Sequence, residues 1–367
     1  MRFCLSVLLS LLFMIGKAQN YYLFAGTYTD GGSKGIYVYR FNAATGKASL
    51  LGNTDSANNP SYLAVSPAGD KVYCVNETGG NQPGGVSAYH FDRKAGTLKF
   101  INRQNSGGDH PCYIAINKKS TWVTVGNYTG GNVSALAISK DGSLMPAAQT
   151  INHSGKGPHK QQEKPHVHGT FFSPDEQFVL VPDLGTDKIV SYKFDASRAV
   201  PMDSFDATAS IPGSGPRHLA FHPNKKWVYA IEELTGTVAA YAYEKGKLRP
   251  MQRLSSHPAS YEGMVGSADI HLSPDGRFLY ASNRGHANSI AIFAVDARGQ
   301  LQLKNVQPTM GKHPRNFTID PSGKYLLVAN RDTNEIIIFR RDAGTGLLQF
   351  TGEKISLSKP VFLALVP

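Results

Sequence analysis

Two histidines, His166 and His168, stand one residue apart in the segment EKPHVHGTFFSPD, just before an apolar run. Residues two apart on a strand project to the same side, so this pair could hold a metal ion together with His159. A histidine can also give or take a proton near neutral pH, and a neighbouring carboxylate can orient its ring. A third interpretation is a polar loop without chemistry. The elements that carry the two histidines must decide between these three.

A repeat of about 50 residues organises the chain. Each copy has a polar start, an apolar strand, a turn of the Ser-Pro-Asp-Gly kind and a second apolar run that closes on a polar residue. The six copies begin at Asn59, His110, His166, Gly215, Gly266 and His313. An alternating third strand follows each copy, and a short fourth strand usually follows a glycine-containing turn. Four short antiparallel strands per repeat are typical of a β-propeller blade.

The two ends of the chain supply a seventh blade. The C-terminal KPVFLALVP matches only a first strand, whereas the N-terminal segment from Tyr21 matches only the second, third and fourth. Pairing the two ends closes the ring and leaves no open sheet edge. We therefore predict an all-β, seven-bladed propeller with four antiparallel strands per blade, a single domain formed by residues 20–367.

Residues 1–19 have the pattern of a secretory signal peptide. Arg2 is followed by an apolar run from Leu5 to Ile15 and then by small and polar residues. The run is shorter than the roughly 20 apolar residues that a membrane-spanning helix needs. We expect an exported protein, periplasmic or secreted, without a membrane span.

The charge and the cysteines narrow the range of partners. The formal net charge is +11, and loss of Arg2 and Lys17 with the signal peptide leaves 11 − 2 = +9. A basic protein suits nucleic acid, an anionic surface or an anionic small molecule, but no long basic run interleaved with aromatic residues supports nucleic acid. Cys74 and Cys112 are expected to be small core residues, although an oxidising compartment would permit one bond between them.

Equivalent repeat positions should form rings, because the first strand of each propeller blade lines the central channel. The first ring, six residues before each turn, comprises Ser61, Cys112, His168, Arg217, Ala268, Arg315 and Val361. The second ring, ten residues after each turn, comprises Glu77, Tyr128, Leu184, Glu233, Arg284 and Arg331. We expect the two rings to lie close together at one mouth of the channel.

Charged side chains are concentrated at these ring positions. Arg217, Arg284 and Arg315 each carry a planar fork that suits a carboxylate or phosphate, which predicts an anion-binding pocket. His168 and Glu233 form a candidate acid–base pair for the attack of water on an ester, with an arginine to stabilise the oxyanion. The alternative is an arginine–glutamate pair that only fills the channel, since charges inside it are costly unless they are paired.

Several phrases of the repeat resemble the seven-bladed propeller lactonases, the family of bacterial 6-phosphogluconolactonase and fungal carboxymuconate-lactonising enzyme. They are HVHGTFFSPD, GPRHLAFHPN, IEELTGTV, ADIHLSPDGRFLYASNR and HPRNFTIDPSGKYLLVAN. The resemblance implies a site without metal or other cofactor, with its histidine and glutamate at His168 and Glu233. It places the substrate-binding arginines at Arg217 and Arg284, and Arg315 fits a further anion contact. Relatives that act on phosphogluconolactone work in the cytoplasm, which is the alternative location.

Three functions remain open at this point. The first is hydrolysis of a sugar-derived anionic lactone, of the 6-phosphogluconolactonase type, by water activated at His168 and Glu233. The second is a non-catalytic propeller, a scaffold or a binder of an anionic carbohydrate in the periplasm. The third is a metal site on His159, His166 and His168, but no carboxylate or cysteine matches it, so His166 is expected to be a solvated loop residue. A closed propeller needs no partner for its sheet edges, so we expect a monomer.

Overall fold

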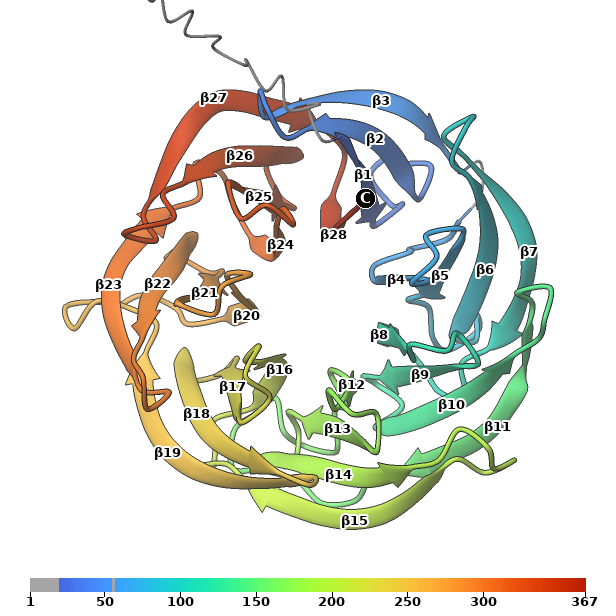
Figure 1. Cartoon of the computed structure of the whole chain (residues 1–367). Helices are drawn as coiled ribbons and strands as arrows, with labels where there is room; N and C mark the ends of the chain where they lie inside the picture. Colours follow the sequence, from blue (N-terminus) through green and yellow to red (C-terminus); the bar gives the residue numbers. More distant parts are fainter. Residues whose placement is uncertain (1–19, 55–56) are drawn as a thin grey trace, which may run out of the picture.

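The structure, a computed structural model, describes residues 20–54 and 57–367. Across these residues the chain forms strands and connecting loops, and none of the described residues is helical. Seven four-stranded antiparallel sheets are arranged as blades around a central axis (Figure 1). The predicted seven-bladed propeller is confirmed. The predicted signal peptide lies outside the described residues.

Six of the blades are each built from four consecutive strands, ordered from the channel outward. The first two are β4 (Leu63–Val65), β5 (Lys71–Asn76), β6 (Gly85–Asp92) and β7 (Thr97–Asn105), then β8 (Pro111–Ile116), β9 (Trp122–Asn127), β10 (Asn132–Ile138) and β11 (Leu144–Asn152). The next two are β12 (Phe171–Phe172), β13 (Phe178–Asp183), β14 (Lys188–Phe194) and β15 (Met202–Ala209), then β16 (Pro216–Phe221), β17 (Trp227–Glu232), β18 (Thr237–Glu244) and β19 (Lys247–Ser255). The last two are β20 (Ser267–Leu272), β21 (Phe278–Asn283), β22 (Ser289–Val295) and β23 (Leu301–Pro308), then β24 (Pro314–Ile319), β25 (Tyr325–Asn330), β26 (Glu335–Arg341) and β27 (Leu348–Ser356).

The seventh blade joins the two ends of the described chain. Its strands are β28 (Pro360–Val366), β1 (Asn20–Thr27), β2 (Tyr37–Asn42) and β3 (Lys47–Asn53), in this order from the channel outward. In β1, Phe24 pairs with Ala364 on one side and with Val38 on the other. The last strand thus supplies the innermost position of a blade begun by the first, as the sequence predicted.

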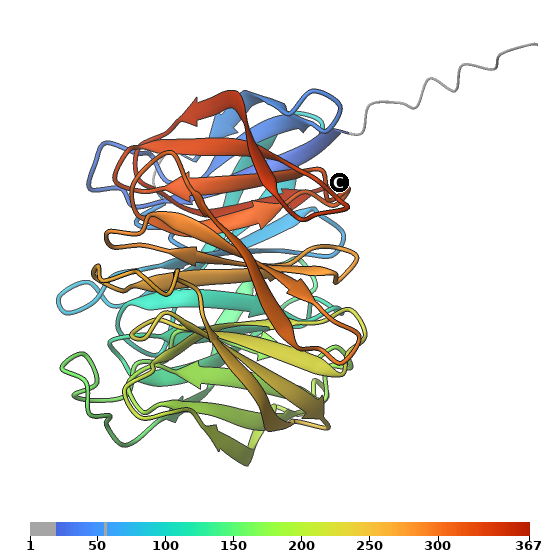
Figure 2. The same ribbon diagram turned by 90° about the vertical axis from the view of Figure 1, so that its left-hand side faces the viewer.

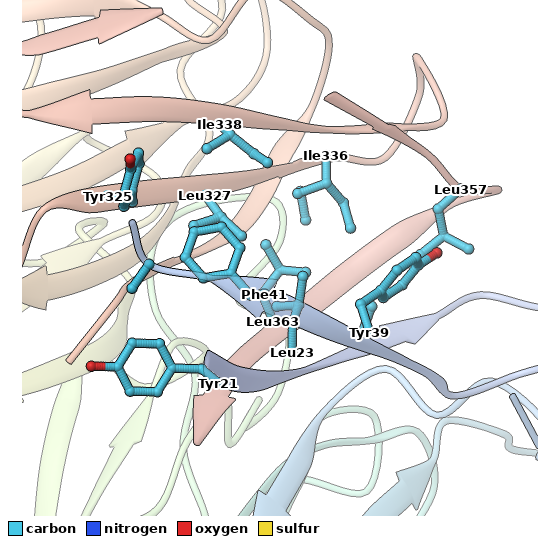
Figure 3. Packing of buried hydrophobic residues seen from close by; sticks show 13 residues of the cluster. Tyr21, Leu23, Tyr39, Phe41, Tyr325, Leu327, Ile336, Ile338, Leu357 and Leu363 are labelled. Atoms are coloured by element: carbon cyan, nitrogen blue, oxygen red, sulfur yellow. The ribbon is translucent and has the colours of Figure 1, made fainter. Parts of the chain in front are cut away.

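Buried side chains between neighbouring blades hold the ring together. Where the closing blade meets β25 and β26, Leu23, Phe41, Leu327 and Leu363 pack in one cluster (Figure 3). The rings of Phe41 and Tyr325 meet edge to face at 5.6 Å between centroids. Because these residues come from both ends of the chain, the hydrophobic effect favours closure of the ring in addition to strand pairing.

The Ser-Pro-Asp turns end the first strands by side-chain hydrogen bonding. The Ser173 hydroxyl accepts the N–H of Phe178 at 3.0 Å and donates to the carboxylate of Asp175. Ser273 does the same with Phe278 at 3.1 Å in another blade. These turns lie at the opposite end of each first strand from the second-ring residues, and the loops gather at the two faces of the disc (Figure 2).

Bulges in the first strands position the first-ring residues. In β16 and β17, Pro216 pairs with Glu232 and the next partners are His218 and Ile231, so Arg217 is the extra residue. Cys112 and Arg315 occupy the same place in β8 and β24. A bulge leaves its extra residue out of the ladder and redirects its side chain. The irregularity therefore recurs where the candidate chemistry lies.

No helix of the described residues is long and apolar enough to cross a membrane.

Candidate active site

One backbone hydrogen bond, repeated in every blade, brings the two predicted rings together. Each second-ring residue directly follows a second strand, and its N–H donates to the carbonyl of a residue just before the first strand. For Glu233 the acceptor is Gly215 at 2.8 Å, and for Arg284 it is Gly266 at 3.0 Å. In the closing blade the N–H of Tyr28 makes this bond, so Tyr28 is the seventh member of the second ring. Tyr28 could not be assigned to the ring from the sequence, because the repeat of the closing blade is divided between the two ends of the chain.

Glu233 lies between two arginines. Its Oε2 is 2.8 Å from Arg217 Nε, and its Oε1 is 2.9 Å from Arg284 Nη2. Arg284 also donates from Nε to the carbonyl of Gly266 at 2.9 Å and from Nη2 to that of Ser267 at 3.1 Å. The structure thus brings together three of the five predicted site residues in one buried cluster.

Burial and charge act in opposite directions on this cluster. Burial raises the pKa of Glu233, but the charges of Arg284 and Arg217 lower it by more than burial raises it. The pKa therefore lies below the usual value, and the carboxylate stays ionised. Burial and then Arg284 lower the pKa of Arg217 to about 10, even though Glu233 raises it. Both groups are therefore charged at neutral pH. Two arginines and one glutamate leave a local charge of 2 − 1 = +1.

Arg315 belongs to a neighbouring cluster with Glu77 and Tyr28. Its Nη2 lies 3.7 Å from Glu77 Oε2, and its guanidinium carbon lies 5.5 Å from the centre of the Tyr28 ring. The Tyr28 hydroxyl donates to Glu77, with oxygen distances of 3.0 and 3.1 Å. Glu77 was placed on the second ring, but its pairing with Arg315 was not predicted. The Arg315–Glu77 pair becomes predictable when both chain ends are placed in one blade and the side chains that face each other on the two rings are compared.

His168 is buried beside the channel, and no carboxylate of the described residues forms a hydrogen bond or ion pair with it. Its Nδ1 lies 3.5 Å from Cys112 Sγ, and its ring meets those of Tyr128 and His218 with centroids 5.3 Å apart in each case. Among the described residues no hydrogen bond joins it to Glu233. Burial, and then the charge of Arg217, hold the pKa of His168 well below the usual value, so the imidazole is neutral. The proposed acid–base pair is thus two separate groups in the same region.

His166 lies in a loop, as we expected, but it is buried rather than solvated. It is 5% exposed, its Nδ1 lies 3.1 Å from the carbonyl oxygen of Tyr128, and its ring stacks on the Tyr128 ring. Its Nε2 contacts Glu163 at 3.1 Å. The backbone N–H of His166 donates to the buried carboxylate of Asp183 at 2.8 Å. Among the described residues no group of three histidine, cysteine or acidic side chains is placed to hold a metal ion.

A cleft of about 350 Å³ opens at the mouth beside Glu233 and Arg284. Its other lining residues include Lys312, His313 and, from the long polar segment before the His166 repeat, Gln161. The cleft presents two cationic side chains, Arg284 and Lys312, and two carboxylates, Glu233 and Asp332, each of which is paired with an arginine. A small anionic molecule matches it in size and charge.

A second polar network in the channel wall was missed by the sequence analysis. Asp269 binds His218 Nδ1 at 2.8 Å and His271 Nε2 at 2.9 Å. These residues lie in the phrases GPRHLAF and ADIHLSPD, but strict strand alternation does not show that two consecutive residues, Arg217 and His218, both take part in buried polar contacts. The bulge at Arg217 makes this arrangement possible.

The closed ring of seven blades and the arginine-lined mouth define a propeller of the lactonase class. The family described as "Lactonase, 7-bladed beta-propeller" matches residues 22–365, and the chain belongs to this family. It is a lactonase, a hydrolase of cyclic carboxylic esters.

Individual relatives resemble the chain over nearly its full length. A 6-phosphogluconolactonase of Formosa agariphila is 42% identical over 333 residues, which are 89% of this chain and 94% of that protein. A 6-phosphogluconolactonase of Bacillus subtilis is 36% identical over 345 residues, 93% of this chain and 97% of that protein. The solved structure of the periplasmic gluconolactonase of Pseudomonas aeruginosa has a TM-score of 0.91 at 37% identity and covers 95% of this chain and 99% of its own.

Proposed function

We propose that the protein hydrolyses an anionic, sugar-derived lactone of the 6-phosphogluconolactone type in the cleft at the channel mouth. The observation that carries this proposal is the position of Glu233, held ionised between Arg217 and Arg284 at the edge of that cleft. The surplus positive charge favours an anionic substrate, and the carboxylate offers an anchor for water. The names of the relatives from Formosa and Bacillus support this substrate class.

In this proposal the arginines bind the substrate and stabilise charge. Arg284 lines the cleft, so its guanidinium can bind the anionic group of the substrate and also donate to the carbonyl oxygen as it becomes an oxyanion, whereas Arg217 lies behind Glu233 and holds that carboxylate. Arg315 would add a further anion contact from the neighbouring cluster. Donors that are fixed before the reaction cost no reorganisation when the charge develops.

Glu233 and His168 are the proposed acid–base groups, with separate roles. Glu233 would hold and orient the attacking water, since its low pKa makes it a weak proton acceptor but a good hydrogen-bond acceptor. Neutral His168 would take the proton of that water as its oxygen bonds to the carbonyl carbon. When the ring C–O bond breaks, the ring oxygen takes the same proton back. The product is the open hydroxy acid, whose carboxyl group then releases one proton to solvent.

A panel of lactones with the purified protein tests this proposal. Hydrolysis of 6-phosphogluconolactone above its spontaneous rate, with a higher kcat/KM than for unphosphorylated gluconolactone, is the expected result. The reverse order would favour the substrate named for the Pseudomonas relative. Binding of gluconate 6-phosphate without hydrolysis of any lactone would favour the non-catalytic binding protein instead.

The location belongs to the proposal as well. We infer from the apolar run of residues 5–15 that the protein is exported and cleaved near residue 19. Mass spectrometry of the protein from fractionated cells tests this: a periplasmic or secreted species that begins near residue 20 is expected, and an uncleaved cytoplasmic species would contradict export.

A further inference from the structure

Asp269 is a buried carboxylate that two histidines share. It is 1% exposed, and its oxygens lie 2.8 Å from His218 Nδ1 and 2.9 Å from His271 Nε2. Asn316 donates to it from its side chain, and the N–H of Ile270 donates at 3.0 Å. Burial raises the pKa of Asp269, but the two histidines lower it by more than burial raises it. The pKa therefore lies far below the usual value, and Asp269 is ionised.

These contacts fix the tautomer of His218. An ionised carboxylate can only accept hydrogen bonds, so Nδ1 of His218 must carry the proton. Burial and then Arg217 lower the pKa of His218 to about 4, so the ring is neutral near pH 7. Its Nε2 is therefore an unprotonated acceptor. This atom is buried and has no hydrogen-bond partner among the described residues.

Four rings, one of them a second imidazole, pack against the His218 ring. The His218 ring meets those of Tyr62 and Tyr113 at 5.9 and 5.2 Å and that of Phe171 at 6.2 Å between centroids. The remaining ring neighbour is His168, at 5.3 Å and nearly perpendicular to it. This spacing allows one water molecule to bridge a nitrogen of each ring, and such bridges are nearly as good as direct hydrogen bonds.

We propose that His218, locked by Asp269, is a positioning residue for His168 in the lactonase reaction. The unprotonated Nε2 of His218 accepts, through one water, the hydrogen bond that His168 donates, and so fixes its orientation. When His168 takes the proton of the attacking water, it becomes a buried imidazolium. The negative charge of Asp269, which is linked to His168 by hydrogen bonds through His218, stabilises this positive charge. When the ring C–O bond breaks, His168 gives this proton to the leaving ring oxygen. This inference rests on the proposed role of His168.

The need for such a counter-charge follows from the charges around His168. Glu233, the carboxylate that was predicted from the sequence to be the partner of His168, is already paired with Arg217 and Arg284. Arg217 and Arg315 both disfavour a positive charge on His168, in addition to burial. Asp269 is the buried carboxylate whose hydrogen-bonded neighbour faces the His168 ring. A histidine oriented by a carboxylate is the arrangement that general-base catalysis uses in hydrolases.

The test is a double-mutant cycle that measures kcat for the hydrolysis of 6-phosphogluconolactone. His218→Phe keeps an aromatic ring beside the stacked rings of Tyr62 and Tyr113 but removes both nitrogens. We expect kcat to fall about 100-fold, within the usual range for acid–base effects, with KM changed less than about threefold. In the His168→Ala background the same substitution should cause no further loss, because the two residues act as a unit.

The matched control is His271→Asn, which removes the other histidine on Asp269 and leaves the His218 contact in place. Its kcat should stay within about threefold of wild type. A ¹⁵N NMR spectrum of the wild-type protein should show the Nδ1–H tautomer of His218 whether or not a variant folds. If His218→Phe keeps kcat within threefold, if the two losses multiply, or if the spectrum shows the Nε2–H tautomer, the inference is wrong. If His168→Ala itself leaves kcat unchanged, it is the proposed role of His168 that fails.

Discussion

Arg217 Nε and Glu233 Oε2 lie 2.8 Å apart in a setting where only 1% and 13% of the two side chains are exposed. A charge in such a setting is costly unless it is paired, and removal of one partner leaves the other uncompensated. Arg284 pairs with the other oxygen of the same carboxylate. The site therefore depends on Glu233 both for its fold and for its chemistry, and these two contributions can be separated by experiment.

Glu233→Gln should lower both activity and stability. Loss of the negative charge leaves Arg217 buried beside Arg284, and breaking a buried pair typically costs about 3 kcal/mol of unfolding free energy. The kcat for lactone hydrolysis should fall at least about 100-fold. Chemical denaturation and steady-state kinetics on the same preparation measure the two effects.

Glu232→Gln is the matched control for this experiment. Glu232 is the preceding residue, is fully buried and forms an ion pair with Arg253. Its replacement should reduce stability while kcat stays near wild type. Equal loss of kcat in the two variants would mean that Glu233 acts only through the fold.

Arg284→Lys should weaken binding of the anionic substrate more than that of a neutral one. The planar guanidinium bonds Glu233, Gly266 and Ser267 at once, and the point charge of lysine cannot reproduce these contacts. We expect KM for 6-phosphogluconolactone to rise about tenfold or more, from loss of one charge-assisted hydrogen bond. The ratio to KM for gluconolactone is the readout, and exposed Arg277→Lys is the control. An equal rise for both lactones would place Arg284 on the lactone group rather than on the anionic substituent.

Cys74 and Cys112 should be inaccessible thiols in the folded protein. Both are free and buried, and burial raises the pKa of each thiol to about 12. The thiolate is the reactive form, so a thiol reagent should label neither residue until the protein unfolds. A reductant should leave the melting temperature unchanged. Labelling at the rate of an exposed thiol, or a lower melting temperature in reductant, would contradict this arrangement.

The repeat in the sequence was sufficient to predict the architecture, because periodicity specifies the blade and the missing strand at one end reappears at the other. It also placed Glu233, Arg217 and Arg284, since equivalent positions of a repeat become neighbours around a channel. An arginine–glutamate pair was only the alternative prediction to a His168–Glu233 pair, because repeat position alone does not decide between them. Which of several charges on a ring meet depends on side-chain reach and on competition between partners, and the arginines lie closer to Glu233 than His168 does.

Two further features depended on local backbone geometry. Arg217 and His218 are consecutive, so regular alternation would place them on opposite faces, and only the bulge accounts for the buried polar contacts of both. His166 lies in irregular chain, because β12 is reduced to Phe171–Phe172, and loop residues are usually exposed to solvent. Its burial comes from tertiary contacts with Tyr128, which no local pattern encodes.

The stability of the protein should fall as the pH is lowered from about 6.5 to 4, and His218 should account for part of this fall. The pKa of His218 is about 4 in the folded protein because of burial and then Arg217, against about 6.5 when unfolded. Between these values the unfolded chain binds the proton and the folded one does not, so protonation favours unfolding. The difference corresponds to roughly 3 kcal/mol for this fully buried ring. His168, whose pKa is also lowered, acts in the same direction.

Denaturant unfolding at pH 7, 5.5 and 4.5 measures this slope in wild type and in His218→Phe. In the variant the slope of unfolding free energy against pH should be smaller, by the amount that corresponds to about one proton fewer taken up on unfolding. His271 has the opposite sign: Asp269 overcomes the effect of burial and raises its pKa, so its contribution is present below pH 6.5 and is lost as the pH rises through the folded value. His271→Asn should therefore abolish the gain in stability between the folded pKa and pH 6.5 and leave the slope below pH 6.5 unchanged, whereas His218→Phe flattens that lower slope. Parallel curves for wild type and His218→Phe would show that His218 titrates alike in the folded and unfolded states and is not held neutral in the channel wall.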